Sequence, residues 1–250
     1  MTTDNFEQGN SLIQFPMISV IVTCFNEEIS IEDTLKELFA ALDAKVASWE
    51  VIIFEDASTD NSLAAIESFL GGVENKQVTL INRRVNAGFV KNVFDGAQQA
   101  KGKYFWVVSG DSTVPCEAMI ALLGNLGKAD LIIPYVQSYT GRGVCRKLIS
   151  WGYSRVVNIL SGSNIKYFNG GSLYLRCDFV NQLPNVSGFS YSADMILRLV
   201  RLGRSYLEVP VVYREGRKAR STALSLKHLK QIFYFFLRLL IGRLMRVRGR

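Results

Sequence analysis

Short apolar runs alternate with helix-length segments along the first half of the chain. The runs are too short for helices and rich in Val and Ile, which is typical of buried parallel strands. The predicted strands cover residues 18–24, 51–54, 78–81, 103–108 and 131–133. Apolar residues recur at helical spacing between them, and the predicted helices cover 30–46, 60–70 and 89–100, with another beginning at Pro115. This alternation predicts an α/β fold with a doubly wound, mostly parallel sheet.

Two of the predicted helix ends carry recognisable signals. Ser30 is a candidate N-cap for the first helix, because its hydroxyl could accept a hydrogen bond from an unpaired backbone N–H. Gly71 and Gly72 are expected to end the second helix in the left-handed conformation, which glycine adopts without steric cost.

The second half of the chain has a less regular pattern. Residues 144–160 are expected to form an amphipathic helix with basic residues, followed by a strand at 172–176, a helix at 193–202 and a final strand at 205–213. There is no internal repeat, and the composition shifts only near Arg214. We therefore expect one domain over residues 1–213, followed by a basic loop and an amphipathic helix over 214–250.

The tail segment 224–245 has one apolar and one basic face when drawn as a helix. The apolar face contains Leu226, Leu229, Phe233, Phe236, Leu237, Leu240, Ile241 and Leu244. This pattern is typical of a helix lying in a membrane interface, and the basic end of the chain would add attraction to anionic lipid. The alternative is a tail helix packed on the body. Phe235 and Leu239 fall on the polar face, which favours a partner helix or an oligomer contact.

The distribution of charge and the single histidine limit the classes of function that the protein could have. The net charge is +7, and residues 214–250 hold 11 Lys and Arg against one acidic residue, so a polyanionic partner is expected for the tail alone. The charge lies beside bulky apolar residues on one helix, which argues against nucleic-acid binding. The single histidine, His228, lies in the tail, so histidine-dependent nucleophilic catalysis in the body is excluded.

The cysteines, the N-terminus and the length of the apolar runs indicate where in the cell the protein is located. The four cysteines are far apart without a C-x-x-C pair, which fits a reducing cytosol better than a zinc site or disulfides. The N-terminus is acidic and polar, unlike a signal peptide. The sequence has no uninterrupted run of 18 apolar residues, so we expect no transmembrane helix. The expected location is cytoplasmic, peripheral on the cytosolic face of a membrane.

Polar motifs follow the first two predicted strands. Residues 23–28 (TCFNEE) offer backbone groups and carboxylates after the first strand, and residues 55–60 (EDASTD) do so after the second. Ligands of open α/β sheets bind at the carboxyl ends of the strands, so both motifs could contact a nucleotide. Each could instead be only a helix lead-in or cap.

At these residues the chain resembles the family-2 glycosyltransferases, which have the GT-A fold. The family's V-x-x-Y/F-N-E-E, D/E-D-x-S-x-D and R-x-x-N-x-G patterns match residues 22–28, 55–60 and 83–88, and the resemblance covers about residues 17–213. It implies an inverting glycosyltransferase that uses a UDP- or GDP-sugar. The donor-binding residues it implies are Thr23, Phe25, Asn26, Glu27, Asp56, Ser58, Arg83, Asn86, Gly88, Ser109, Gly110 and Asp111.

The family's metal-binding D-x-D motif aligns with Ser109-Gly110-Asp111, where only the second aspartate is present. Mg²⁺ commonly binds through one or two carboxylates together with substrate phosphates, so Asp111 is the candidate ligand for Mg²⁺ or Mn²⁺. The alternative is that Asp111 only caps the helix at Pro115.

Candidate acceptor residues lie in the second half. Gly170 and Gly171 could let a sugar or acceptor approach the backbone, or could form only a tight turn. Asp194 lies where inverting members of the family place a carboxylate near the acceptor, although an aspartate there could also be a helix cap.

Beyond the last strand, the chain is similar to the polyprenyl-phosphate sugar synthases of the dolichyl-phosphate mannose synthase type. Those proteins have a tyrosine–arginine pair and then G-x-S-K, where this chain has Tyr213-Arg214 and then residues 219–222 (ARST). Arg214, Arg217 and Arg220 could clamp the diphosphate and the acceptor phosphate, with Ser221 beside them. The alternative is a solubilising basic loop.

The resemblance therefore predicts transfer of a sugar to a polyprenyl phosphate at the cytosolic membrane face, with Asp111, Asp194, Arg214 and Arg220 as catalytic candidates. An ionised phosphate needs no strong base. A second possibility is transfer to a glycan or glycolipid hydroxyl with Asp194 as base. A third is a non-catalytic nucleotide-sugar-binding subunit at the membrane, which the incomplete D-x-D motif would suit. The tail helix could also contact an oligomer or a membrane-protein partner.

Overall fold

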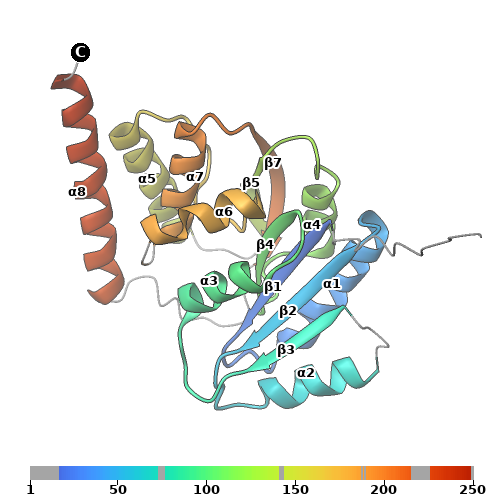
Figure 1. The fold of residues 1–250 in the computed structure, drawn as a ribbon. Helices are drawn as coiled ribbons and strands as arrows, with labels where there is room; N and C mark the ends of the chain where they lie inside the picture. The colour runs from blue at the N-terminus through green and yellow to red at the C-terminus, as the bar shows by residue number, and fades with distance from the viewer. Residues whose placement is uncertain are drawn as a thin grey trace, which may run out of the picture.

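The protein is described by a computed structural model that covers residues 17–72, 77–140, 144–186, 188, 190–214 and 226–248. These residues form a seven-stranded sheet in the order β3-β2-β1-β4-β6-β5-β7, with helices on both faces (Figure 1). The strands are β1 (Ile18–Cys24), β2 (Trp49–Glu55), β3 (Val78–Asn82), β4 (Tyr104–Ser109), β5 (Leu131–Thr140), β6 (Leu173–Leu175) and β7 (Tyr206–Arg214). The helices are α1 (Ile31–Lys45), α2 (Ser62–Gly71), α3 (Phe89–Gln99), α4 (Cys116–Leu123), α5 (Val144–Ser161), α6 (Arg176–Gln182), α7 (Tyr191–Arg201) and α8 (Leu226–Arg248), with a 3₁₀ turn η1 at Leu183–Asn185.

The predicted doubly wound, mostly parallel sheet is confirmed. Strands β3, β2, β1 and β4 are mutually parallel, and β5 is parallel to β7. The short strand β6 is antiparallel to both β4 and β5 and joins the two parallel groups. Its reversed direction divides the sheet into a first half (β1–β4) and a second half (β5–β7).

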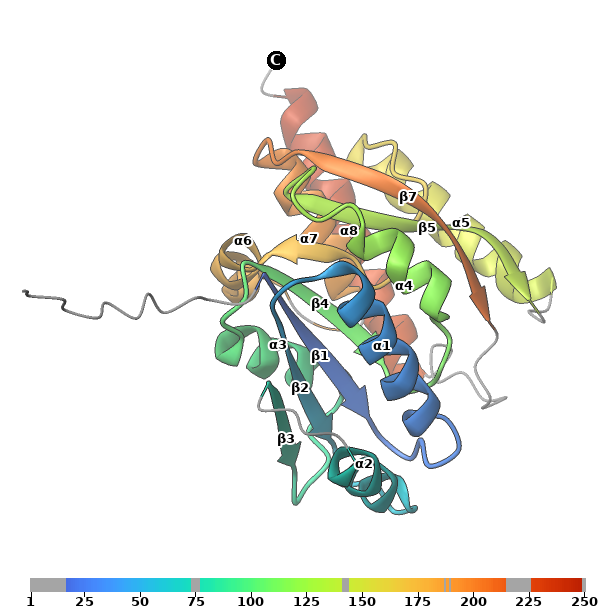
Figure 2. The same cartoon turned by 90° about the vertical axis from the view of Figure 1, so that its right-hand side faces the viewer.

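Each face of the sheet has its own apolar core. Side chains of β1 alternate between the two cores, so that Val20 and Val22 pack under α1 and α4 whereas Ile21 faces α3. Helices α5, α6, α7 and α8 belong to the core that contains Ile21. Figure 2 shows α1 and α4 on one side of the sheet and α7 and α8 on the other.

Several sequence predictions of element ends were wrong. Ser30 occupies the N-cap position of α1 as predicted, but its hydroxyl makes no capping bond and instead donates to the Glu27 carboxylate. Gly72 has φ −91°, a right-handed conformation, so α2 does not end in a left-handed residue. The predicted strand at 131–133 continues to Thr140 beside β7, because it gains a full-length parallel partner there.

The segment around β6 also differs from the prediction. The strand is only Leu173–Leu175, and Arg176 already begins α6, a helix that the sequence pattern did not indicate. A seven-residue helix spans too few turns to give a clear periodic signal. Among the described residues, no helix is both long and apolar enough to cross a bilayer.

Candidate active site

The motifs after β1 and β2 bind each other. The Asn26 backbone N–H donates to the Ser58 hydroxyl at 2.9 Å, and the Thr59 N–H donates to Asn26 Oδ1 at 2.7 Å. Asn26 and Ala57 have φ of 56° and 58°, a left-handed conformation that bends both turns sharply. The side chains of Asn26 and Ser58, which the family resemblance assigns to the donor, are thus used to join two turns.

Asp56 joins the second motif to the third. Its side chain is buried, and its carboxylate accepts from the Ala87 N–H at 2.8 Å and from the Gly88 N–H at 2.9 Å. The Asn86 side chain donates to the Asp56 carbonyl at 3.1 Å. A carboxylate that accepts two backbone N–H bonds fixes the loop that leads into α3.

Arg83 stabilises the same loop from the other side. Its Nε donates to Asn92 at 2.6 Å, its Nη2 contacts Asp95 at 2.6 Å, and its guanidinium lies 5.1 Å from the Phe54 ring centre. Burial alone would raise the pKa of Asp95, but hydrogen bonds from Lys91 and Arg83 hold that pKa below its usual value. The sequence patterns did not single out Asn92 or Asp95; Asn92 is buried in α3 and Asp95 is partly exposed.

Asp111 follows β4 in a tight turn. Gly110 donates its N–H to the Thr23 carbonyl at 2.9 Å, and a Cβ at Gly110 would lie 2.9 Å from Ile31 Cδ1 and 3.2 Å from the Thr23 carbonyl oxygen, so a side chain there would crowd this turn. Asp111 Oδ1 accepts from the N–H and hydroxyl of Thr113 at 3.2 and 2.8 Å. Asp111 does not cap α4, because Pro115 occupies the N-cap and the Cys116 N–H donates to Glu37.

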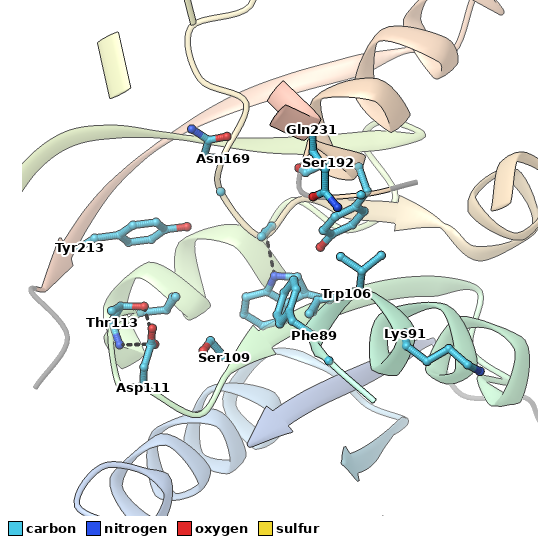
Figure 3. A pocket seen from close by; sticks show the side chains of 18 of the residues that line it. Phe89, Lys91, Trp106, Ser109, Asp111, Thr113, Asn169, Ser192, Tyr213 and Gln231 are labelled. Atoms are coloured by element: carbon cyan, nitrogen blue, oxygen red, sulfur yellow. Dashed lines mark hydrogen bonds between the residues drawn. The ribbon is translucent and has the colours of Figure 1, made fainter. Parts of the chain in front are cut away.

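A cavity of about 660 Å³ lies beyond the carboxyl end of β4 (Figure 3). It is lined by Ala87, Gly88, Phe89, Val90, Lys91, Trp106, Val107, Ser109, Asp111, Thr113, Val114, Asn169, Gly170, Gly171, Gly188, Tyr191, Ser192, Tyr213 and Gln231. The cavity brings together five residues that the sequence indicated: Gly88, Ser109, Asp111, Gly170 and Gly171. The other described candidates do not line it, namely Thr23, Phe25, Asn26, Glu27, Asp56, Ser58, Arg83, Asn86, Gly110, Asp194 and Arg214.

Two of the cavity glycines, Gly170 and Gly171, are required by close packing. A Cβ at Gly171 would lie 2.6 Å from the Val107 carbonyl oxygen, and one at Gly170 would lie 2.6 Å from Pro134 Cγ. The buried Trp106 donates its Nε1–H to the Gly171 carbonyl at 2.8 Å. This bond fixes the 169–171 segment against β4, and the backbone itself forms one wall of the cavity.

Two tyrosines line the same cavity, Tyr191 at the start of α7 and Tyr213 in β7. Burial raises the pKa of both Tyr191 and Tyr213, and the charge of the nearby Asp111 contributes to the shift at Tyr213. Both phenols therefore stay protonated at neutral pH and can donate hydrogen bonds. The ring of Tyr191 lies 6.0 Å from that of Phe89, which adds an aromatic surface beside the start of α3.

Helix α8 supplies one cavity residue, Gln231. Gly188 has φ +72°, and a Cβ there would lie 3.4 Å from the Gln231 side chain, so the two segments are in close contact. Gln231 is not among the residues of the predicted apolar face of the tail helix, and the sequence gave no sign of a role in the site. Its position depends on how α8 packs, which a helical pattern cannot predict.

Asp194 lies in the contact between α7 and α8. It is 3% exposed, and its carboxylate contacts Arg198 Nε at 3.2 Å and Arg238 Nη2 at 2.5 Å. The structure places its two oxygens on these arginines, and the residue is absent from the cavity lining. The carboxylate proposed as a base is thus used to bind α8 to the body.

Arg214 ends β7 and forms an ion pair with Glu37 of α1. Glu37 also accepts from the Cys116 N–H at 2.9 Å, and the Arg214 N–H donates to the Thr113 carbonyl at 2.9 Å. Arg214 therefore fixes the turn that carries Asp111. Arg217, Arg220 and Ser221, the other predicted phosphate contacts, lie outside the described residues.

The donor set at the cavity suits a divalent cation only together with a ligand. The described residues contain no group of three or more His, Cys, Asp and Glu that could hold a metal ion by themselves. Asp111 is the one carboxylate in the cavity lining, with Ser109 and Thr113 beside it. A single carboxylate with two hydroxyls fits the pattern in which Mg²⁺ binds through one protein carboxylate plus phosphate oxygens.

Comparison with solved structures identifies the fold. A mannosyltransferase of Pyrobaculum calidifontis, solved with GDP-Man and Mn²⁺, has a TM-score of 0.64 and 17% identity, covering 90% of this chain and 65% of its own. Glucosyl-3-phosphoglycerate synthase of Mycobacterium tuberculosis has a TM-score of 0.67 and 16% identity, covering 90% and 80%. The likeness at this identity shows the GT-A fold alone.

Sequence comparison identifies relatives that act on polyprenyl phosphates. Dodecaprenyl-phosphate galacturonate synthase of Rhizobium johnstonii is 21% identical over 73% of this chain, which spans only 54% of that protein. Undecaprenyl-phosphate mannosyltransferase of Micrococcus luteus is 25% identical over 82% of this chain and 86% of its own length. The model of "Glycosyl transferase family 2" matches residues 19–181, which is more than half of the chain. The chain belongs to glycosyl transferase family 2.

Proposed function

We propose that the protein transfers a sugar from a UDP- or GDP-sugar to a polyprenyl phosphate at the cytosolic face of a membrane. The names of the relatives from Rhizobium johnstonii and Micrococcus luteus support the acceptor class. The observation that carries the proposal is a single cavity that reaches from Asp111, at the end of β4, to Gln231 of the C-terminal helix. The sugar nucleotide and the lipid-linked acceptor could both bind in that cavity.

The donor end is defined by Asp111 and the start of α3. The cavity is lined by residues 87–91, and the first N–H groups of α3 have no partner within the helix, because the Asn92 N–H is the one that bonds back to Gly88. Such a helix start attracts the oxygens of a diphosphate. Asp111 lies across the cavity and would hold a divalent cation, which when bound would neutralise charge on the leaving nucleotide.

The acceptor end uses the second half of the sheet. Tyr191 and Tyr213 keep their protons and can donate to phosphate or sugar oxygens, while Trp106 and Phe89 exclude water from the reacting atoms. Arg214 and the predicted contacts Arg217, Arg220 and Ser221 follow directly after Tyr213 in the chain. A phosphate acceptor is already ionised, so the reaction needs no carboxylate base, and a single displacement would invert the anomeric carbon, as is typical of the family.

Transfer to a sugar hydroxyl remains the second candidate, because relatives include a poly-β-1,6-N-acetyl-D-glucosamine synthase of Staphylococcus epidermidis. That chemistry needs a base in reach of the acceptor proton. Asp194, the predicted base, has its carboxylate on Arg198 and Arg238. The phosphate acceptor is therefore the better supported of the two.

A donor and acceptor screen tests the proposal. The purified chain is incubated with UDP- and GDP-sugars, Mg²⁺ or Mn²⁺, and either a polyprenyl phosphate or a polyprenol in detergent, and products are identified by mass spectrometry. We expect a sugar–phosphate–lipid from the phosphate alone, and its loss in Asp111→Ala. Nucleotide binding without any product, measured by calorimetry, would identify a non-catalytic subunit, and product from the hydroxyl acceptor would favour the second candidate.

A further inference from the structure

We propose that the outward faces of α5 and α8 form one surface that docks on an anionic lipid bilayer. This α5–α8 surface comprises Leu148, Ile149, Trp151, Val156 and Ile159 of α5 and Leu229, Phe233, Tyr234, Leu237, Leu240, Ile241 and Leu244 of α8. The sequence pattern indicated a membrane role for the tail helix only. The part played by α5, and the orientation of both helices, come from the structure and do not depend on the transfer reaction.

Helix α5 has its apolar side chains on the outside. Leu148, Trp151 and Ile159 are 60%, 62% and 63% exposed, and the helical spacing of these positions places them on one arc. The opposite arc is formed by Ser154 and Val157, which are buried against the body. A surface helix of a water-soluble domain normally turns its polar side to solvent, and α5 does the reverse.

Helix α8 packs on the body through a narrow stripe of its residues, and its wide apolar face is directed outward. Phe235 and Leu239 are 5% and 4% exposed and join the core beneath α5 and α7, whereas Phe233 is 63% exposed. The Asp194–Arg238 ion pair fixes this rotation. Both alternatives for the tail are thus combined. The helix packs on the body through Phe235 and Leu239, which broke its apolar pattern, and through the partly buried Phe236. The described side chains of the predicted apolar face other than Phe236 remain exposed.

The two outward faces adjoin one another. The rings of Tyr153 on α5 and Phe236 on α8 have centres 5.7 Å apart, and the Arg243 guanidinium donates to the Ile159 carbonyl. Figure 1 shows the two helices side by side at one end of the molecule. The exposed apolar residues form one surface across two helices, and exposed apolar surfaces of this extent mark interaction sites.

Charge identifies the occupant as a lipid bilayer. Residues 144–161 and 226–248 contain nine Lys and Arg and no Asp or Glu. Exposed Arg155 lies over the Trp151 ring at 5.5 Å and exposed Lys230 over the Tyr234 ring at 5.9 Å, so cations and aromatic rings are paired at the surface, as in membrane-interface belts. Each basic residue near an anionic membrane contributes about 1 kcal/mol. A second copy of this chain would bring like charges together.

The arrangement also positions the cavity. Gln231 lies in the cavity wall on the same helix whose outward face carries Phe233 and Leu237. A helix with its side chains is about 10–12 Å across. Docking through α8 would thus hold the cavity about one helix diameter from the headgroups, within reach of a lipid-linked phosphate.

Trp151 provides a direct test, because the other two tryptophans of the chain, Trp49 and Trp106, are 6% and 1% exposed. The purified full chain is mixed with vesicles of phosphatidylglycerol and phosphatidylcholine, with no sugar nucleotide present. We expect a blue shift of the tryptophan emission, quenching by brominated acyl chains, and binding at least 10-fold weaker to phosphatidylcholine alone. Trp151→Phe should lose the shift and keep most of the sedimentation with vesicles.

Matched variants distinguish binding through the α5–α8 surface from binding through any exposed apolar side chain. Ile159→Glu on α5 and Phe233→Glu on α8 should each weaken vesicle binding at least 10-fold. Ile29→Glu changes a residue with the same 63% exposure, beside α1 on the other face of the sheet, and should bind as the parent does. Circular dichroism melting confirms that each variant is folded.

Several outcomes would overturn the proposal. One is an unchanged Trp151 emission with anionic vesicles, and another is equal weakening by Ile29→Glu. A third is a concentration-dependent dimer that shifts Trp151 without lipid, because a second copy would then occupy the surface.

Discussion

The two halves of the molecule are held together by different kinds of interaction. In the first half, β1–β4, neighbouring turns bind each other through backbone N–H groups and buried oxygens, as at Asp56 with Ala87 and Gly88. In the second half, helices are joined by ion pairs of long side chains, as at Asp194 with Arg238. The first half is specified by short motifs with fixed spacing, and the second by contacts between residues far apart in the chain.

This difference matters for how each half could perform its proposed role. A nucleotide diphosphate needs donors and a carboxylate fixed to within a fraction of an ångström, which turns locked by backbone bonds provide. A lipid-linked acceptor must enter from a membrane, and a wall formed by a helix attached through side chains can adapt more easily. Three sets of substitutions and a change of pH test this contrast, beginning with the largest expected effect.

Asp111→Asn removes a charge from the donor end without changing the size of the side chain. We expect sugar–lipid formation to fall at least 100-fold, because electrostatic stabilisation of the leaving group is typically worth that much. Thr113 can still donate to the amide oxygen, so the melting temperature should change by less than about 2 °C. Steady-state kinetics and calorimetric melting measure both. Ser109→Asp supplies the missing first aspartate of the D-x-D pattern and should tighten Mn²⁺ binding about 10-fold. Unchanged activity in Asp111→Asn would contradict the assignment.

Asp56→Ala should destabilise the protein by about 3 kcal/mol. The side chain is buried, and its loss leaves the Ala87 and Gly88 N–H groups without their charged acceptor. A loss of this size lowers the melting temperature of a domain of this length by about 6–12 °C. Nucleotide binding should weaken in parallel, since α3 begins at the same loop. Asp43→Asn is the control, because Asp43 is exposed and its oxygen can still accept from Trp49. If Asp56→Ala and Asp43→Asn destabilised the protein equally, the hydrogen bonds of the Asp56 carboxylate would not contribute to its stability.

Asp194→Asn and Arg238→Gln distinguish a base from an attachment point for α8. If Asp194 only binds α8, both variants should lose about 1–2 kcal/mol of stability, since the carboxylate is buried but Arg238 is half exposed. Both should also release α8 to limited proteolysis and lower turnover to a similar, modest extent, because Gln231 leaves the cavity. A base would behave differently: Asp194→Asn would abolish transfer to a hydroxyl acceptor while Arg238→Gln retained it.

Much of the first half could be predicted from the sequence, because each signal is local. Apolar runs of Val and Ile give β1 to β4, and the motifs at 23–28, 55–60 and 83–88 lie at the strand ends as expected. What the motifs could not give was the direction of each side chain. Asn26, Ser58 and Arg83 match family positions, yet they bind other turns and helices of the chain and do not line the cavity.

The second half could be predicted only in outline. Helix α5 was expected, but whether its apolar arc faced the core or the solvent depends on α7 and α8, which are distant in sequence. The pattern of α8 was read correctly as an apolar face with two exceptions, and only the structure shows that the exceptions, Phe235 and Leu239, are the packing residues. Glu37 gave no signal at all, because its partners Arg214 and Cys116 are far along the chain.

Raised pH should weaken the second half more than the first, with the smallest effect of the four. Burial raises the pKa of Cys24 in β1 to about 12 and also raises that of Tyr104 in β4 and Cys116 in α4, but four tyrosines with a raised pKa lie in the second half. Burial raises the pKa of Tyr153 and of Tyr174 to about 12 from an ordinary value of 10.0, and also raises that of Tyr191 and Tyr213. The folded state then keeps protons that the unfolded chain loses, so the stability that these tyrosines contribute is complete below about pH 10 and decreases above it, whereas the contribution of Cys24 decreases above about pH 9. Each tyrosine contributes at most about 1.4 kcal/mol per unit of pKa shift.

Hydrogen exchange at pH 9 and at pH 10.5, corrected for the intrinsic rate, locates the weakening. These four tyrosines belong to α5, β6, α7 and β7, whereas β2 and β3 contain no tyrosine or cysteine, so α5 and α7 should lose more protection at the higher pH than β2 and β3 do. Tyr153→Phe removes one titrating group from the contact between α5 and α8 and should reduce the loss in those two helices. Equal loss of exchange protection across β1–β7 would mean that the two halves unfold as one unit. The halves would then differ in the contacts that hold them together but not in their stability.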